Sequence, residues 1–296
     1  MKVIFDTDIG NDIDDTLALT YLLCQPECEL LGVTTTTGLP VQRAKLADSV
    51  IKYFGKDIPV YPGVENPILT PQKQPLCPQE AVLEHCVHSR AFRMNYAVEF
   101  IREMTEQYPG EITLISVGPA TNLGVLFAAY PNAASGLRAV SQMIGYYKFN
   151  APLIRGYSEW NCYCDPIAAQ ICFQAPIDSY RLFGLDVTMK LILSEQETRE
   201  RFTSRSFGPV NMYRDFWFRR QADRPGMIFH DPLAAACVFD ESICGYVRGG
   251  VAVDLKSDIF YAATLMKEGE GSHEAAVSVD VERFFTHFFD VVNGAG

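Results

Sequence analysis

Short apolar segments alternate with segments of helical periodicity along most of the chain. Strand-like runs are expected over residues 2–5, 29–35, 112–117, 137–145 and 180–187. Helices are expected between them, over residues 14–25, 41–54, 95–108, 121–130 and 166–173. This alternation predicts an α/β fold with a mainly parallel central sheet flanked by helices on both faces. Ligands of such sheets bind outside the carboxyl ends of the strands.

Two stretches of the chain interrupt this alternation. Residues 62–94 contain many prolines and form either a segment that closes over a site or an ordinary surface loop. Residues 194–229 are mostly helical in pattern, and we expect them to pack as an added helical portion. From about residue 244 the pattern predicts strands and then a closing helix over residues 281–292. No repeat or linker divides the sequence, so residues 1–296 are expected to form a single domain.

The composition is that of a folded, acidic protein. Hydrophobic residues make up 48% of the chain and aromatic residues 12%, which is enough to bury a sizeable core. The net charge of -11 argues against nucleic acid or an anionic membrane as a partner, because like charges repel. The densest basic stretch, residues 214–224, also holds acidic and aromatic side chains, so we interpret it as an amphipathic helix.

The cysteines indicate a reducing environment. There are nine, without a CxxC pair, and several stand in apolar runs, as expected for buried thiols. The first residues lead directly into a strand-like run and lack the apolar region of a secretory signal. No apolar stretch approaches the ~20 residues of a membrane span. We therefore expect a cytoplasmic protein without a membrane partner.

The first predicted strand leads into a dense group of aspartates. Five lie within ten residues where the strand passes into a helix, namely Asp6, Asp8, Asp12, Asp14 and Asp15. A cation would relieve their mutual repulsion, and hard carboxylate oxygens suit Ca²⁺ or Mg²⁺. Aspartates also cap helices and favour the helix dipole, but this accounts for one or two residues and not for five. The segment therefore predicts a metal site.

A phosphatase of the haloacid-dehalogenase type is an alternative interpretation of this segment. Such enzymes end their first strand in DxD, with an aspartate nucleophile and Mg²⁺. Asp6 and Asp8 satisfy this motif, but Gly10 stands where Thr or Val is usual, and the further carboxylates would repel a phosphate. The sequence contains neither G-x-x-x-x-G-K-[ST] nor G-x-G-x-x-G. These observations favour a neutral substrate over a phosphorylated one.

The aspartate segment and several later motifs together resemble a known family. A DxDxG strand end is followed by an aspartate pair and an apolar helix, here Asp6, Asp8, Gly10, Asp14, Asp15, Leu17, Ala18 and Leu19. The same order continues through "LLGVTTTTG", "PVYPG", "ITLISVGPATNL", "EWNCYCDPIAA" and "HDPLAAA". In these motifs, which span most of the chain, the sequence resembles the nucleoside hydrolases that prefer inosine and uridine.

The resemblance implies a single α/β domain with a Rossmann-like core and a Ca²⁺ ion at the edge of its sheet. The implied metal ligands are Asp8, Asp15, Asp231 and the backbone carbonyl of Val117. The reaction implied is hydrolysis of the N-glycosidic bond of a ribonucleoside, which yields ribose and the free base. In the implied mechanism Asp8 is the general base for a Ca²⁺-bound water.

The resemblance also implies which residues contact the nucleoside. Asp14, Glu159 and Asn161 would hold ribose hydroxyls, and carboxylates around the sugar would stabilise an oxocarbenium-like transition state. Trp160 stands where the family has a phenylalanine that contacts the sugar or base. His230, next to Asp231, is the best-placed proton donor for the leaving base. The aromatic residues nearby either add stacking surface or belong to the core: Tyr146, Tyr147, Tyr157 and Tyr163.

The aspartate segment departs from the family pattern in its length. Two additional residues separate Gly10 from the pair Asp14 and Asp15. A gap-free alignment would place Asp12 and Ile13 at the pair instead and would lose one ligand. The apolar helix that follows favours Asp14 and Asp15, with Asp12 as a supplement.

Other departures leave the substrate open. Leu39 follows the second strand where the family has a ribose-binding asparagine, so the preferred base and sugar are undetermined. Asn150 is a candidate for a second family asparagine, and His85 or His88 for a histidine in a mobile loop. A riboside-binding protein without catalysis, or with altered specificity, is the alternative from a different class. The family resemblance further implies a homodimer or homotetramer.

Overall fold

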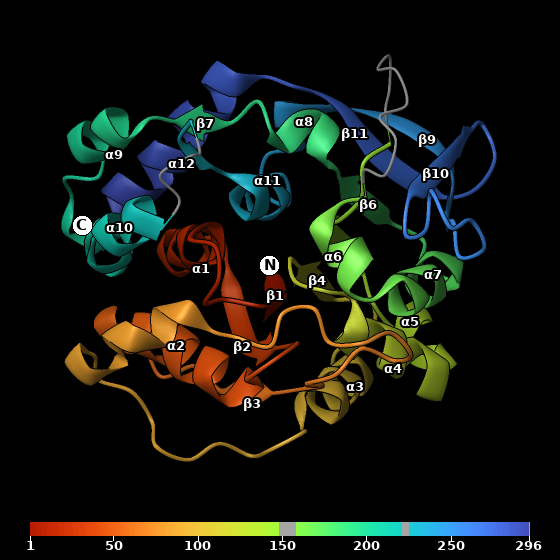
Figure 1. Cartoon of the computed structure of the whole chain (residues 1–296), viewed down its shortest axis with the longest axis horizontal. Coiled ribbons are helices and arrows are strands. Elements are labelled where there is room, and N and C mark those ends of the chain that lie inside the picture. Colours follow the sequence, from red (N-terminus) through yellow and green to blue (C-terminus); the bar gives the residue numbers. More distant parts are fainter. Residues whose placement is uncertain (148–157, 221–224, 296) are drawn as a thin grey trace.

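The computed structural model describes residues 1–147, 158–220 and 225–295 (Figure 1). Its centre is a nine-stranded sheet in the order β10-β9-β11-β6-β5-β4-β1-β2-β3. Neighbours from β11 to β3 run parallel, whereas β9 pairs antiparallel with β10 and β11. The prediction of a mainly parallel sheet is confirmed. The strands of this sheet are β1 (Lys2–Thr7), β2 (Glu29–Thr35), β3 (Val60–Pro62), β4 (Ile112–Ser116), β5 (Ala139–Met143), β6 (Tyr180–Phe183), β9 (Cys244–Val253), β10 (Thr264–Glu268) and β11 (His273–Val279).

Helices cover both faces of the sheet, as the alternating pattern predicts (Figure 1). The α-helices are α1 (Asp14–Cys24), α2 (Pro40–Tyr53), α3 (Ala97–Gln107), α4 (Thr121–Ala129), α5 (Pro131–Ser135), α6 (Trp160–Cys164), α7 (Pro166–Gln174), α8 (Leu185–Thr188), α9 (Glu195–Arg201), α10 (Gly208–Arg220), α11 (His230–Ala236) and α12 (Val281–Gly294). Short 3-10 helices are η1 (Pro78–His85), η2 (Arg205–Phe207) and η3 (Glu241–Ile243). A separate two-stranded sheet joins β7 (Ile192–Leu193) and β8 (Met227–Ile228).

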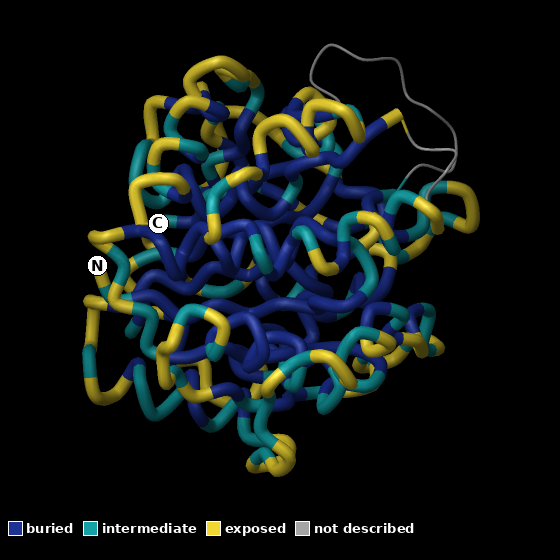
Figure 2. The backbone as a smooth tube through the Cα atoms, turned by 90° about the vertical axis from the view of Figure 1, so that its left-hand side faces the viewer, coloured by how far each residue is buried: buried dark blue, intermediate teal, exposed yellow. Residues whose placement is uncertain are grey.

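The central sheet separates two apolar cores. Successive side chains of a strand point to opposite faces, so Val3 and Phe5 enter one core while Ile4 enters the other. The first core is completed by α1, α2, α10, α11 and α12, and the second by α3, α4 and α7. Figure 2 shows the buried backbone concentrated between these layers and the exposed backbone at the periphery. Because both faces are covered, the central strands consist of nearly continuous apolar runs.

The run 180–187 is only partly a strand. It pairs with β5 and β11 as far as Phe183 and then turns into α8, beginning at Leu185. The strand ends here because its neighbour β5 also ends, at Met143, and the N–H of Leu185 donates to the carbonyl of Gly145 instead (3.0 Å). The expected helical portion at 194–229 is present as α9, η2 and α10, followed by β8. In the basic stretch, residues 221–224 lie outside the described residues.

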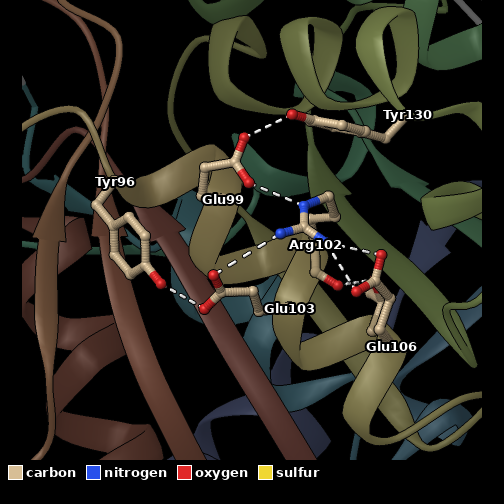
Figure 3. Close-up of polar contacts among 7 residues, drawn as sticks. Tyr96, Glu99, Arg102, Glu103, Glu106 and Tyr130 are labelled. Atoms are coloured by element: carbon tan, nitrogen blue, oxygen red, sulfur yellow. Dashed lines mark hydrogen bonds and ion pairs between the residues drawn. The ribbon is translucent and has the colours of Figure 1, made fainter.

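Half-buried and exposed charges on α3 form a network of ion pairs with neighbouring side chains (Figure 3). Arg102 donates to Glu99 (2.8 Å) and to Glu106 (2.7 Å), and it lies 3.7 Å from Glu103. Tyr130, just before α5, donates to Glu99 (2.6 Å), and Tyr96 donates to Glu103. Three carboxylates are thus gathered around one guanidinium at the protein surface.

The parallel pairing brings the carboxyl ends of β1, β2, β4 and β5 to one edge of the sheet. The proline-rich segment that follows β3 runs from there towards α6 and α7 and returns to η1 beside α2 (Figure 1). No helix among the described residues is long and apolar enough to span a membrane. All nine cysteines are free thiols, and seven of them are buried, as the sequence predicts.

Candidate active site

Three carboxylates meet at the carboxyl edge of the sheet. Asp14 and Asp15 form the first turn of α1, and Asp231 lies in the first turn of α11, which packs against α1. One carboxylate oxygen of each lies within 4.8 Å of those of the others, and the three residues are only 3–4% exposed. The N–H of Asp231 faces Asp14 Oδ2 at 3.4 Å. We refer to these three residues as the aspartate triad.

Burial gives the aspartate triad a strong preference for a bound proton or cation. It raises the pKa of all three carboxyl groups well above the usual range, and the negative charges of neighbouring aspartates raise each further. For Asp15 the hydrogen bond from Thr7 opposes this effect. A hard cation relieves the same repulsion, and carboxylate oxygens are its preferred ligands. The triad can therefore hold a metal ion.

Asp8 lies beside the aspartate triad with its carboxylate turned to other partners. Its Oδ2 accepts a hydrogen bond from Nε2 of Gln74, and a Cβ at Gly118 would lie 2.9 Å from its Oδ1. Burial raises the pKa of Asp8, and the positive charge of Arg43 and the Gln74 hydrogen bond oppose the rise. The three carboxylates that lie close enough to share a metal ion include Asp14, which the resemblance assigns to the sugar, and do not include Asp8. The role of Asp8 as a ligand stays a prediction.

Arg43 is a buried cation that the sequence analysis missed. Its guanidinium is fully buried and donates to the carbonyls of Gly38 (2.8 Å), Ile9 (3.1 Å), Leu76 (3.0 Å) and Asp8. Arg43 thereby joins three segments of the chain, at residues 8–9, 38 and 76, and its charge is directed at backbone carbonyls. A signal was present in the sequence, because residue 43 falls on the apolar stripe of α2 with residues 40, 44, 47 and 51.

Asn161 connects the ends of two strands at the site. Its Nδ2 donates to the carbonyl of Val117 (2.7 Å), just after β4, and to that of Met143 (3.0 Å), the last residue of β5. The carbonyl of Val117, the expected backbone ligand, therefore lies at the same edge as the predicted sugar-binding residue. Both residues are buried.

Glu159 caps α6 and faces the interior. Its Oε1 accepts from the N–H of Asn161 (2.6 Å), and its Oε2 accepts from the N–H groups of Gly145 (2.9 Å) and Cys162 (3.0 Å). Burial raises its pKa to about 7 against the effect of these hydrogen bonds. A carboxylate has about four acceptor positions, so three bonds leave one for a ligand hydroxyl.

Trp160 is the outward-facing member of this segment. Its ring is 48% exposed and lies 6.1 Å from that of Tyr163, while its Nε1 donates to Oε1 of Gln74. Of the other tyrosines, Tyr147 is a core residue whose hydroxyl donates to a backbone carbonyl. Tyr157 and Asn150 lie outside the described residues.

His230 begins α11 directly before Asp231. The ring is half-buried, and its Nδ1 is 2.7 Å from the hydroxyl of Thr188, the last residue of α8. Thr188 belongs to α8, the short helix that stands where the sequence predicts the end of a strand, so α8 positions the partner of His230. The ring is fixed next to the aspartate triad by a residue 42 positions away.

Asp12, the supplementary aspartate, is held by elements from outside the aspartate segment. Its Oδ1 accepts from Nε1 of Trp217 on α10 (2.8 Å), and its carbonyl accepts from Nε2 of Gln79 (2.7 Å). Its negative charge raises the pKa of Asp14. The added helical portion therefore contributes directly to the wall of the site.

Leu39 has a left-handed backbone (φ 58°, ψ 50°) immediately before α2. Asparagine adopts this conformation more readily than a leucine, for which it costs roughly 1–2 kcal/mol. The Leu39 side chain packs against the first core. His85 is exposed beside Glu84, and Nδ1 of His88 contacts the carbonyl of Ser89 (2.8 Å). Each histidine thus contacts a residue next to it in the sequence.

These observations define a class of protein. Buried carboxylates that can hold a metal ion lie at the carboxyl edge of a parallel sheet, beside a further acid, a histidine and an exposed indole. Such an arrangement suits attack by water on a small polar substrate, which is the work of a metal-assisted hydrolase of α/β fold.

The comparisons with known proteins specify the family. The sequence profile of inosine-uridine preferring nucleoside hydrolases matches residues 3–286, and the chain belongs to this family. It is 29% identical over 288 residues to uridine nucleosidase 1 of Arabidopsis thaliana, covering 90% of this chain and 82% of the relative. It is 26% identical over 296 residues to the non-specific ribonucleoside hydrolase RihC of Salmonella paratyphi C (strain RKS4594), covering 96% and 95%.

A solved structure supports the same assignment. The chain is similar to a purine-preferring ribonucleoside hydrolase from Gardnerella vaginalis, with a TM-score of 0.84 and 26% identity over 100% of this chain and 99% of that one. The predicted family and fold are confirmed, and the protein is an enzyme that hydrolyses the N-glycosidic bond of ribonucleosides. The phosphatase interpretation is thereby set aside.

Proposed function

We propose that the enzyme hydrolyses neutral ribonucleosides with Ca²⁺ as its cofactor, Asp8 as general base and His230 as general acid. The observation that carries the proposal is the aspartate triad, where Asp14, Asp15 and Asp231 are buried with their carboxylates within 4.8 Å of one another. Buried carboxylates this close together favour a bound cation or a proton, and a bound cation can assist the attack of water on a nucleoside.

The proposed Ca²⁺ ligands are Asp15, Asp231, Asp8 and the carbonyl of Val117. Ca²⁺ suits an all-oxygen donor set that mixes carboxylates and a backbone carbonyl, because it accepts six to eight oxygens in flexible geometry. When bound, Ca²⁺ supplies positive charge that lowers the pKa of a coordinated water. Asp14, which lies next to Asp15 within the triad, is proposed to hold a ribose hydroxyl as well as to add negative charge.

We propose the following roles for the chain's own residues. Asp8 takes a proton from the attacking water, whose oxygen bonds to the anomeric carbon of the ribose. The carbon–nitrogen bond breaks, and its electron pair passes to the base. His230 delivers a proton to that base, with its ring oriented by Thr188 through Nδ1 (2.7 Å). The surrounding carboxylates stabilise the positive charge that develops on the sugar.

The nucleoside is proposed to lie between the aspartate triad and Trp160. Glu159 retains acceptor capacity for a ribose hydroxyl, and Asn161 places a polar amide beside it. The half-exposed Trp160 ring offers an apolar surface to the sugar or base. The acidic surroundings disfavour a phosphate, which supports nucleosides over nucleotides as substrates.

The test is a panel assay of purine and pyrimidine ribonucleosides with purified protein. Release of reducing sugar is measured with added Ca²⁺, with Mg²⁺, and with a chelator. We expect hydrolysis of at least one nucleoside, loss of activity with the chelator, and recovery with Ca²⁺. Protein that binds a nucleoside without releasing sugar under any of these conditions would instead be a riboside-binding protein.

Two further proposals concern the protein in solution. The family resemblance leads us to propose a homodimer or homotetramer, which sedimentation equilibrium measures directly. The nine free thiols are consistent with a reducing compartment, and we propose the cytoplasm as its location.

A further inference from the structure

Residues 68–79, which we call the strap, are attached to the site at both ends. At one end the N–H of Ile68 donates to Asp165 Oδ2 (2.9 Å), and the hydroxyl of Thr70 donates to the carbonyl of Cys164 (3.1 Å). At the other end the N–H of Gln79 donates to the carbonyl of Gly10 (3.0 Å). The strap therefore extends from the α6–α7 segment to the aspartate segment and connects the two.

Gln74 is the residue of the strap that reaches into the site. It is only 3% exposed, although glutamine is usually a surface residue. Its Nε2 donates to Oδ2 of Asp8, and its Oε1 accepts from Nε1 of Trp160. One carboxamide thus joins a carboxylate from the end of β1 to an indole from the start of α6.

The main chain of the strap fixes the position of this carboxamide. The N–H of Gln74 donates to Oε1 of Gln72 (2.8 Å), and Nη2 of Arg43 donates to the carbonyl of Leu76 (3.0 Å). The carbonyl of Gln74 packs against Gly38, where a Cβ would lie only 2.2 Å from it. With its backbone held on both sides, Gln74 can impose a direction on the two side chains that it contacts.

We propose that Gln74 is a positioning residue for nucleoside hydrolysis, and this rests on the proposed role of Asp8 as the base. Its N–H occupies Oδ2 of Asp8, which directs the other oxygen to the reacting water. Its carbonyl oxygen holds the Trp160 ring across the binding site. One side chain thereby fixes the position of the general base, Asp8, relative to the aromatic ring of Trp160.

The substitution Gln74→Met tests this proposal, because methionine keeps the length of the side chain and loses both hydrogen bonds. The kcat and KM are measured with a nucleoside that wild-type protein cleaves, at saturating Ca²⁺, together with the unfolding temperature. Loss of a hydrogen bond to a charged group predicts a fall in kcat of about 10-fold or more. We expect a smaller rise in KM, since the Trp160 ring loses its hydrogen-bond partner, and little change in the unfolding temperature.

Thr70→Val is the matched control from the same strap. The hydroxyl of Thr70 donates to the carbonyl of Cys164 (3.1 Å), so its loss loosens one end of the strap without removing any contact of Gln74. We expect its kcat to stay within about 3-fold of wild type. An equal loss of kcat in both variants would assign the effect to the order of the strap and overturn the proposal, as would wild-type kcat in Gln74→Met.

A double-mutant cycle with Trp160→Phe provides a second test. Phenylalanine keeps an aromatic ring and loses the indole N–H, so we expect its effect on kcat to be smaller in the Gln74→Met background than in wild type. Strictly additive effects would show that Gln74 does not connect the two residues. If Gln74→Met fails to fold, Gln74→Asn replaces it, since a shorter carboxamide cannot span both partners. Absence of hydrolysis by wild-type protein would refute the proposed function instead.

Discussion

Two groups of three carboxylates in this protein have opposite electrostatic character. On α3, Glu99, Glu103 and Glu106 surround Arg102 at the surface (Figure 3). Hydrogen bonds from Tyr130 and Arg102 lower the pKa of Glu99, and its neighbours raise that of Arg102. In the aspartate triad, burial raises the pKa of every carboxyl group. Both groups contain three acids, so the opposite pKa shifts come from their surroundings. The α3 group lies next to solvent and an arginine, whereas the aspartate triad is buried.

The comparison also explains why Arg43 does not neutralise the aspartate triad. Arg102 lies half-buried at the surface and pairs with three carboxylate side chains, whereas Arg43 is fully buried and donates to backbone carbonyls. Its charge lowers the pKa of Asp15 only against a larger effect of burial. The number of acids in a cluster is therefore not enough to indicate a metal site. The cluster must also be buried from water and lack a side-chain cation as a partner.

The largest effect is expected from Asp8→Asn, which removes the proposed base and keeps its shape. We expect kcat to fall about 1,000-fold, because an amide cannot accept the proton of the attacking water. Steady-state release of reducing sugar measures this fall. Glu103→Gln, which changes an acid of the α3 group in the same way, is the control and should leave kcat at the wild-type value. Substantial turnover by Asp8→Asn would contradict the assignment of the base.

Asp15→Asn is expected to weaken metal binding about 100-fold, since affinity for Ca²⁺ depends on the number of charged ligands. Isothermal titration with Ca²⁺ measures the dissociation constant. Glu106→Gln serves as the control on the exposed group. Equal Ca²⁺ affinities for wild type and Asp15→Asn would place the cation elsewhere and remove the main distinction between the two groups of acids.

Arg43→Met tests whether the buried arginine is structural. The substitution removes four hydrogen bonds to carbonyls that would then be left without a donor, so we expect a loss of about 3 kcal/mol in the free energy of unfolding. Denaturant titration measures it. A loss no larger than that of the exposed control Arg199→Met would show that the carbonyls find other donors.

Asp6→Asn tests the effect of burial on a carboxylate without a metal. Burial raises the pKa of Asp6 to about 7, and its Oδ2 makes no hydrogen bond within the described residues. Because the folded protein favours the protonated form of Asp6, the free energy of unfolding is highest below about pH 4. It decreases as the pH rises through about 7, where the buried carboxyl loses its proton. We therefore expect Asp6→Asn to gain stability over wild type between pH 5 and pH 8, in thermal unfolding with a chelator. Parallel pH curves would argue against this.

The smallest effect is expected from Arg102→Met. Ion pairs between exposed side chains contribute little because water already solvates the charges, so the unfolding temperature should change by no more than about 2 °C. Ca²⁺ affinity should not change. A large loss of stability would mean that the α3 network stabilises the fold as much as the buried contacts do. The contrast drawn between surface and buried acids would then be wrong.

Local patterns in the sequence were sufficient to predict the order of elements in the sheet region. Strand 29–35 and the helix after Asp14 were located from apolar runs and periodicity, and both are confirmed. The strand expected to continue to residue 187 was wrong beyond Phe183, because its end depends on where β5 ends. Pairing partners set the length of a strand, and a single sequence does not record them.

For this protein, the sequence alone determined the parallel sheet and the family, and it singled out the segments that contain the aspartate triad. It did so because period, spacing and motif order are local properties of the chain. Only the tertiary structure decided that Asp14 joins Asp15 and Asp231, that Arg43 is turned towards carbonyls, and that Gln74 connects Asp8 with Trp160. These contacts join residues far apart in the sequence, and burial, which depends on the whole fold, sets their energies.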